Sequence, residues 1–118
     1  MISRGNRFHG HGSLRHVYTR GETIRGQFFA LKYRVNPKRK TYRAAIVVSK
    51  KVHKSAVVRN RIRRRLYELV RTNTNPESTP TDMVFIVYSE NVATMPAPEL
   101  KEQVISQLQK AGVARTDS

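Results

Sequence analysis

The sequence predicts an α+β protein in which helices pack on a small β-sheet as a two-layer α-β sandwich. Residues 28–35 alternate between apolar and polar side chains as a strand does, residues 83–88 form a short apolar run, and apolar side chains recur at helical spacing over residues 58–70. These segments predict the order α-β-β-α-β-α, with room for one further short strand near Thr23. A chain of 118 residues suits one compact domain. We expect this domain to span residues 13–113, between an N-terminal arm of residues 1–12 and a C-terminal tail of residues 114–118.

The first elements follow from capping and turn residues. Residues 1–12 are basic and rich in Gly and His, which is typical of a flexible arm. Ser13 is a suitable N-cap, and Leu14, Val17 and Tyr18 share one face of a short helix that Gly21 ends.

Two strands and a basic turn come next. Phe29, Leu31 and Tyr33 alternate with Ala30, Lys32 and Arg34, so Lys32 is expected on the more polar face of its strand. Residues 36–40 are turn-like, and residues 42–49 are rich in Ile and Val. The two strands are therefore predicted to form a β-hairpin.

The second half of the chain is simpler. Residues 72–81 are rich in Thr, Asn and Pro and predict a loop, and residues 83–88 predict a buried strand. Leu100, Val104 and Leu108 then mark one face of a final helix that ends near Gly112.

Charge is divided unevenly along the chain. The formal net charge is +15, and residues 1–71 hold 20 Lys or Arg against only Glu22 and Glu68, whereas residues 72–118 are net negative. Such a division indicates a surface that faces a polyanion such as RNA.

Composition also argues against other classes. The chain has no Cys, so a disulfide framework or a thiolate zinc site is not expected. No apolar run is long enough for a membrane span or a signal peptide, and we expect a cytoplasmic protein without a membrane partner or small-molecule cofactor. His9 and His11 are weak metal ligands without a carboxylate beside them, so no protein metal site is predicted. No catalytic triad or carboxylate pair can be assembled from the few acids of residues 1–71.

Residues 49–71 carry the most specific signal. Nine of these 23 residues are Lys or Arg. On a helix, Val58, Ile62, Leu66, Leu69 and Val70 fall within an arc of about 120°, which predicts docking on the sheet. The cations lie on both margins of this stripe, with Glu68 the only acid. Since like charges this close repel each other, bound phosphates explain the run better than a solvated surface does.

The same segment resembles the signature of the ribonuclease P protein family. The resemblance rests on Ser49-Lys50-Lys51 followed by Ala56-Val57-Val58-Arg59-Asn60-Arg61-Ile62-Arg63-Arg64. It extends to Asn6-Arg7-Phe8, Val17-Tyr18, Gly21 and Phe29-Ala30-Leu31, and so covers nearly the whole chain.

The resemblance implies a function as an accessory subunit of an endoribonuclease. In that family the protein binds a catalytic RNA and the 5′ leader of precursor tRNA, and promotes removal of the leader. The family also implies a left-handed crossover between the parallel strands that flank the basic helix. It implies that Mg²⁺ is bound mainly by the RNA, so no catalytic residue is expected in the protein.

Two sets of site residues follow from the resemblance. The expected contacts to the catalytic RNA are Lys50, Lys51, Lys54, Arg61, Arg64 and Arg65. The expected contacts to the leader are Leu14, Tyr18, Lys32, Arg59, Asn60, Arg63 and Tyr67. Leu14, Lys32 and Tyr67 depart from the residues frequent in the family, as does His53 in the loop before the signature.

Two other functions compete with this interpretation. A structural RNA-binding protein, such as a ribosomal protein, would have similar size, charge and fold class. A DNA-binding regulator is disfavoured because the basic helix uses its apolar face for a sheet and has no helix-turn-helix partner.

Overall fold

The computed structural model describes residues 11–115, so residues 1–10 of the predicted arm and residues 116–118 lie outside the described part. The described elements are α1 (His11–Arg20), β1 (Glu22–Arg25), β2 (Phe29–Val35), β3 (Arg43–Val48), α2 (Ala56–Asn73), β4 (Thr81–Val87), the 3₁₀ helix η2 (Glu90–Ala93) and α3 (Ala97–Lys110). The α+β class is confirmed. So is the short extra strand near Thr23, which is β1.

The four strands form one sheet in the order β1-β2-β4-β3. Strand β2 pairs antiparallel with both β1 and β4, whereas β3 and β4 are parallel neighbours joined through α2. This β3-α2-β4 unit is the one to which the family resemblance assigns a left-handed crossover.

The predicted β-hairpin is wrong, because β4 lies between β2 and β3. An alternating pattern tells which side chains share a face, but it does not tell which strand lies alongside. The central place suits β4, whose consecutive residues Met83, Val84 and Phe85 are each fully buried.

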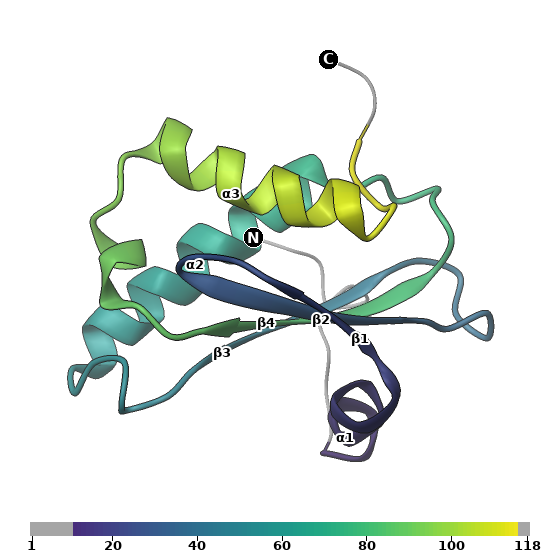
Figure 1. The fold of residues 1–118 in the computed structure, drawn as a ribbon, viewed down its shortest axis with the longest axis horizontal. Coiled ribbons are helices and arrows are strands. Elements are labelled where there is room, and N and C mark those ends of the chain that lie inside the picture. Colours follow the sequence, from purple (N-terminus) through teal and green to yellow (C-terminus); the bar gives the residue numbers. More distant parts are fainter. Residues whose placement is uncertain (1–10, 116–118) are drawn as a thin grey trace.

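Helices cover both faces of the sheet (Figure 1). Helices α2 and α3 pack together on one face, here called the first face, and α1 lies alone on the opposite, second face. The main core fills the first face, and its largest fully buried side chains include Phe29, Leu31, Ile62, Leu66 and Phe85. A smaller cluster of Val17, Ala45 and Val84 attaches α1 to the second face.

The ends of the helices differ in how well they match the sequence. Helix α1 begins at His11, two residues before the predicted N-cap Ser13, and the Ser13 side chain lies outside the described part. Gly21 does follow the last residue of α1, and its N–H donates to the Val17 carbonyl at 2.8 Å. Helix α3 ends before Gly112, which has a φ of 76°.

The segment after α3 pairs with the residues at the C-terminal end of α2. Ala114 forms a β-bridge with Thr74, and the Arg115 N–H donates to the Asn73 carbonyl at 2.8 Å. Among the helices of residues 11–115, none combines the length and apolar character that crossing a membrane requires.

Candidate nucleic-acid interface

Helix α2 docks on the first face through the predicted apolar stripe. Ile62, Leu66 and Val70 are fully buried, and Val58 and Leu69 are half-buried against the same core. Ser55 caps the helix, because its Oγ accepts from the Val58 N–H at 3.4 Å. The remaining circumference of the helix is where its arginines lie.

Two of these arginines are held out to solvent. Arg61 and Arg64 are exposed, and within residues 11–115 neither forms a hydrogen bond or an ion pair. An unpaired guanidinium keeps all five N–H donors available and can fork onto a phosphate. Both residues therefore have the geometry expected of phosphate contacts.

The loop before α2 carries three more free cations. Lys50, Lys51 and Lys54 are all exposed. Arg59 braces this loop, since its Nη1 donates to the carbonyls of His53 and Lys54, each at 3.0 Å. His53 adds a local contact, in which its Nδ1 accepts from the Ser55 N–H at 3.0 Å.

Arg65 has a different role from Arg61 and Arg64. Its guanidinium is half-buried and donates to the Val92 carbonyl at 2.7 Å and to the Met95 carbonyl, so it joins α2 to η2 and the residues that follow it. The family resemblance assigns Arg65 only to RNA contact, and these hydrogen bonds within the fold are not visible from the sequence. Two satisfied carbonyls make it a structural contact, whatever else it touches.

At helical spacing, Tyr67 lies beyond one margin of the apolar stripe of α2, and Arg61 and Arg65 lie beyond the opposite margin. The Tyr67 Oη accepts from the Ile46 N–H at 3.2 Å, along the edge of β3 that faces away from β4. Asn60 and Arg63 belong to the same margin as Tyr67 and hydrogen-bond to each other.

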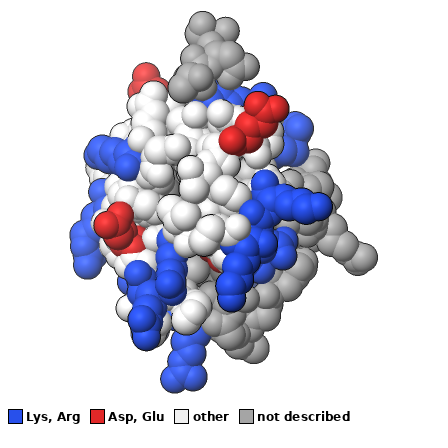
Figure 2. Space-filling view, turned by 90° about the vertical axis from the view of Figure 1, so that its right-hand side faces the viewer, with Lys and Arg blue, Asp and Glu red and all other residues white. Residues whose placement is uncertain are grey.

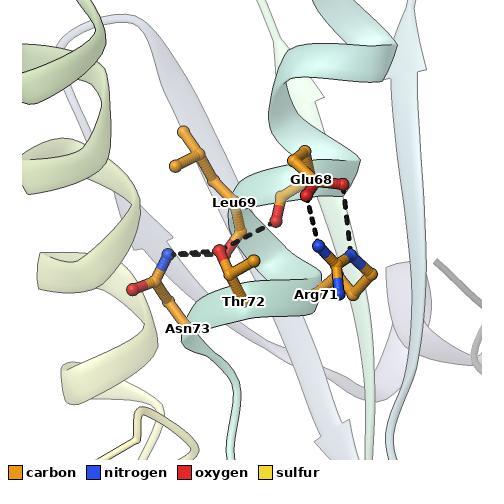
Figure 3. A network of polar contacts seen from close by, with 5 residues as sticks. All are labelled: Glu68, Leu69, Arg71, Thr72 and Asn73. Atoms are coloured by element: carbon orange, nitrogen blue, oxygen red, sulfur yellow. Dashed lines mark hydrogen bonds and ion pairs between the residues drawn. The ribbon is translucent and has the colours of Figure 1, made fainter. Parts of the chain in front are cut away.

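The C-terminal turn of α2 neutralises its own charge (Figure 3). Glu68 accepts from Arg71 through both carboxylate oxygens, and this hydrogen bonding lowers the pKa of Glu68. Thr72 donates its hydroxyl to the Glu68 carbonyl at 2.9 Å, and Asn73 donates to the Leu69 carbonyl at 2.8 Å. The uncompensated positive charge of α2 is thus concentrated upstream of this turn.

The second face holds the remaining predicted leader contacts. Leu14 is partly buried against the small cluster of the second face, and the Lys32 ammonium lies 5.7 Å from the centre of the Tyr18 ring. Tyr18 is 39% exposed, and burial of the rest of the ring raises the pKa of its hydroxyl. The structure confirms that Lys32 lies on the face of its strand opposite to Leu31 and Tyr33.

The seven predicted leader residues do not form one cluster. Leu14, Tyr18 and Lys32 share the second face, whereas Arg59, Asn60, Arg63 and Tyr67 belong to a helix on the first face. The Tyr67 hydroxyl bound to the Ile46 N–H places Tyr67 at the free edge of β3. Helical spacing gave the margins of α2 but not this separation, because it carries no information on which strand is at the edge.

The comparisons with known proteins agree with this geometry. The family model for ribonuclease P matches residues 2–112. The ribonuclease P protein component of Synechococcus sp. strain WH7803 is 32% identical over 111 residues, which cover 93% of this chain and 83% of the relative. That of Roseiflexus castenholzii is 43% identical over 79 residues, which cover 66% of this chain and 63% of the relative.

A solved structure has the same fold. The RNase P protein of Staphylococcus aureus superposes with a TM-score of 0.78 at 21% identity, over 93% of this chain and 98% of that one. At this level of identity the likeness concerns the fold alone.

A basic α+β domain with an arginine-rich helix on its sheet defines a class of RNA-binding proteins. Within that class, the chain belongs to the ribonuclease P protein family. It is a protein subunit of an endoribonuclease that processes tRNA, and the alternative of a ribosomal protein falls away.

Proposed function

We propose that two surfaces divide the work of this subunit. The exposed cations Arg61 and Arg64 of α2, with Lys50, Lys51 and Lys54 of the preceding loop, contact phosphates of the catalytic RNA. The surface of Leu14, Tyr18 and Lys32 contacts the single-stranded 5′ leader of precursor tRNA. The observation that carries the first assignment is that Arg61 and Arg64 have no partner within residues 11–115.

The leader surface is supported by its chemistry. A partly exposed tyrosine ring with an ammonium beside it offers a stacking platform and a phosphate contact within one short stretch of surface. Arg59, Asn60, Arg63 and Tyr67 continue the proposed path of the leader around the edge of β3. Arg65 uses Nη1 and Nη2 to donate to the Val92 and Met95 carbonyls. It would therefore contact RNA only through its remaining N–H groups.

We propose that Mg²⁺ acts in the holoenzyme through the RNA subunit. Within residues 11–115, no cluster of three or more His, Cys, Asp or Glu side chains could hold a metal ion. The side chains described here therefore do not fit such an ion, and no step is assigned to a metal on the protein. We place the reaction in the cytoplasm, where precursor tRNA is made.

The experiment is equilibrium binding of the protein to a bacterial ribonuclease P RNA over a range of salt concentrations. The double variant Arg61→Ala, Arg64→Ala should bind more weakly. Log affinity falls as log salt rises, and each phosphate contact that the variant loses should make this negative slope shallower by about 0.7 to 0.9. The control is Lys101→Ala, Lys110→Ala, which removes two exposed charges from α3. Equal slopes for the two double variants would refute the assignment of Arg61 and Arg64.

A further inference from the structure

A row of three charged side chains crosses the second face near one end of the sheet. Arg34 of β2 is the register partner of Asp82 of β4, and Asp82 is the register partner of Arg43 of β3. One carboxylate thus lies between two guanidinium groups, and the row carries one positive charge more than it can neutralise.

Both carboxylate oxygens of Asp82 accept hydrogen bonds from side chains other than Arg34. The Arg43 Nε and Nη2 donate to the two carboxylate oxygens at 2.8 Å each, and the Asn36 amide donates to one of them at 3.0 Å. The side chains of Arg43 and Asp82 are only 13% and 9% exposed, and hydrogen bonding to Asp82 raises the pKa of Arg43. The charges of Arg43 and Asp82 neutralise each other through this bidentate contact. Within residues 11–115, Arg34 forms no ion pair.

Arg34 shows the consequence directly. Its Nη1 is buried, and no residue of the described range 11–115 accepts a hydrogen bond from it. A buried guanidinium donor without an acceptor is costly, and native proteins seldom retain one without a ligand or water to satisfy it.

Arg34 and Asp82 also line an open cavity of about 340 Å³. Arg34, Asn36, Lys38 and Asp82 line it on the sheet side, and His16 and Val17 of α1 line it opposite. Asn36 also fixes the loop at its rim, because its Oδ1 accepts from the Lys38 N–H at 3.3 Å. Leu14, Tyr18 and Lys32 are not part of the lining, so the cavity is separate from the proposed leader surface.

Figure 2 faces the end of the sheet where β2 ends and β4 begins. Lys and Arg side chains gather over the lower half of this view, which is the side of the sheet where α1 lies in Figure 1, and few acids interrupt them. The cavity itself has the cations Arg34 and Lys38 in its lining, so an anion is attracted toward it.

We propose that this cavity is a phosphate site, and that it takes a phosphodiester group of RNA. Arg34 would donate to the phosphate oxygens from within and Lys38 from the rim. Asp82 does not repel the phosphate strongly, because Arg43 already balances its charge. The assignment to RNA rests on the proposed function, whereas the affinity of the cavity for a phosphate oxyanion does not.

The first test uses inorganic phosphate alone. Backbone amide signals of Arg34, Asn36 and Lys38 should shift saturably when phosphate replaces chloride at constant ionic strength. Arg34→Met keeps the length of the side chain but removes its donors, and it should weaken this binding at least tenfold. The exposed Lys101→Met variant on α3 should leave the binding unchanged. Absence of saturable shifts in the wild type, or their persistence in Arg34→Met, overturns the site.

The second test measures affinity for ribonuclease P RNA as a function of salt. Relative to Lys101→Met, Arg34→Met should make the negative slope of log affinity against log salt shallower by about 0.7 to 0.9. This change corresponds to the loss of one phosphate contact. If Arg34→Met abolishes the phosphate shifts but has the slope of the control, the cavity binds free phosphate and the assignment to RNA is wrong. If the wild type itself fails to bind this RNA, the proposed function fails, while the phosphate titration still decides the site.

A further variant covers the case that Arg34→Met does not fold. Lys38 is exposed on a loop, so Lys38→Met should retain the fold. It should weaken phosphate binding several-fold without abolishing it, because Arg34 remains in place. Unchanged phosphate affinity in Lys38→Met would overturn the role given to the rim.

Discussion

Arg64 and Arg65 are neighbours in the chain, yet only Arg65 makes contacts with another element. The carbonyls that it satisfies belong to Val92 and Met95, which are 27 and 30 positions away in the sequence. Arg64 points to solvent and has no partner within residues 11–115. The arginine run of α2 therefore combines a side chain that stabilises the fold with side chains that are free to bind a ligand.

This difference predicts opposite effects of two similar substitutions. Arg65→Ala should lower the free energy of unfolding by about 1 to 3 kcal/mol, because two carbonyls in a partly buried site lose their donor. Arg64→Ala should change it by no more than about 0.5 kcal/mol. Urea denaturation of both variants without RNA measures the difference. Equal stability of the two would show that the contacts of Arg65 contribute nothing.

Some of these residue roles could be predicted from sequence and others could not. Burial of Ile62, Leu66 and Val70 follows from helical spacing, because the period of a helix fixes which side chains share a face. The position of Lys32 on the second face follows from strand parity for the same reason. The partners of Arg65, and the row of Arg34, Asp82 and Arg43, depend on which distant segments lie alongside, and no local pattern carries that information.

Helix α1 is attached to the sheet through a small set of contacts. Its C-terminal end, at Gly21, lies close to the backbone of β2. Val17 is its fully buried anchor, in a cluster of only three buried residues. A Cβ on Gly21 would lie 2.5 Å from the Val17 carbonyl oxygen and 2.8 Å from that of Tyr33. Both neighbours are backbone atoms, so the helix and β2 would have to move apart to admit a larger residue.

Gly21→Ala should therefore loosen α1 selectively. We expect a loss of roughly 1 to 3 kcal/mol in the free energy of unfolding, since packing strain of this kind usually costs that much. Hydrogen exchange should accelerate in α1, which presents Leu14 and Tyr18, more than in α2 or β4. Gly112→Ala is the control, because its strain lies after α3 and comes from a φ of 76° rather than from contact with α1. Uniform acceleration in Gly21→Ala would contradict the prediction.

At the scale of elements, the sequence predicts segments better than their neighbours. All six predicted helices and strands have a counterpart in the structure, namely α1, β2, β3, α2, β4 and α3, because period and capping are local properties. The sequence does not predict the pairing of β2 with β4. The basic turn of residues 36–40 lies between two predicted strands, and this arrangement suggests a hairpin instead. What the local pattern could not show is that the buried character of β4 makes it the central strand of the sheet.

The whole molecule presents its positive charge on more than one side of the sheet. Helix α2 and its loop extend from the first face, while Lys32, Arg34 and the basic residues 36–40 belong to the second face or its end. The proposed function assigns a large folded RNA to one of these surfaces and a single strand to the other. The division of charge along the sequence indicated a polyanion, but only the fold shows that the cations separate into distinct surfaces.

This separation predicts that the two RNA contacts can be uncoupled. Tyr18→Ala should weaken binding of precursor tRNA to the holoenzyme by about 1 to 3 kcal/mol for each stacked base lost, and it should leave affinity for the catalytic RNA nearly unchanged. Mature tRNA, which has no leader, should bind as before. Tyr18→Phe retains the ring and should restore the affinity for precursor tRNA, because the packing and stacking surface remains while the hydroxyl is removed. The measurement is equilibrium binding of both tRNA forms at one salt concentration, with holoenzyme concentration set by active-site titration. An equal loss for precursor and mature tRNA in Tyr18→Ala would place the defect outside the leader contact and refute the role of the second face.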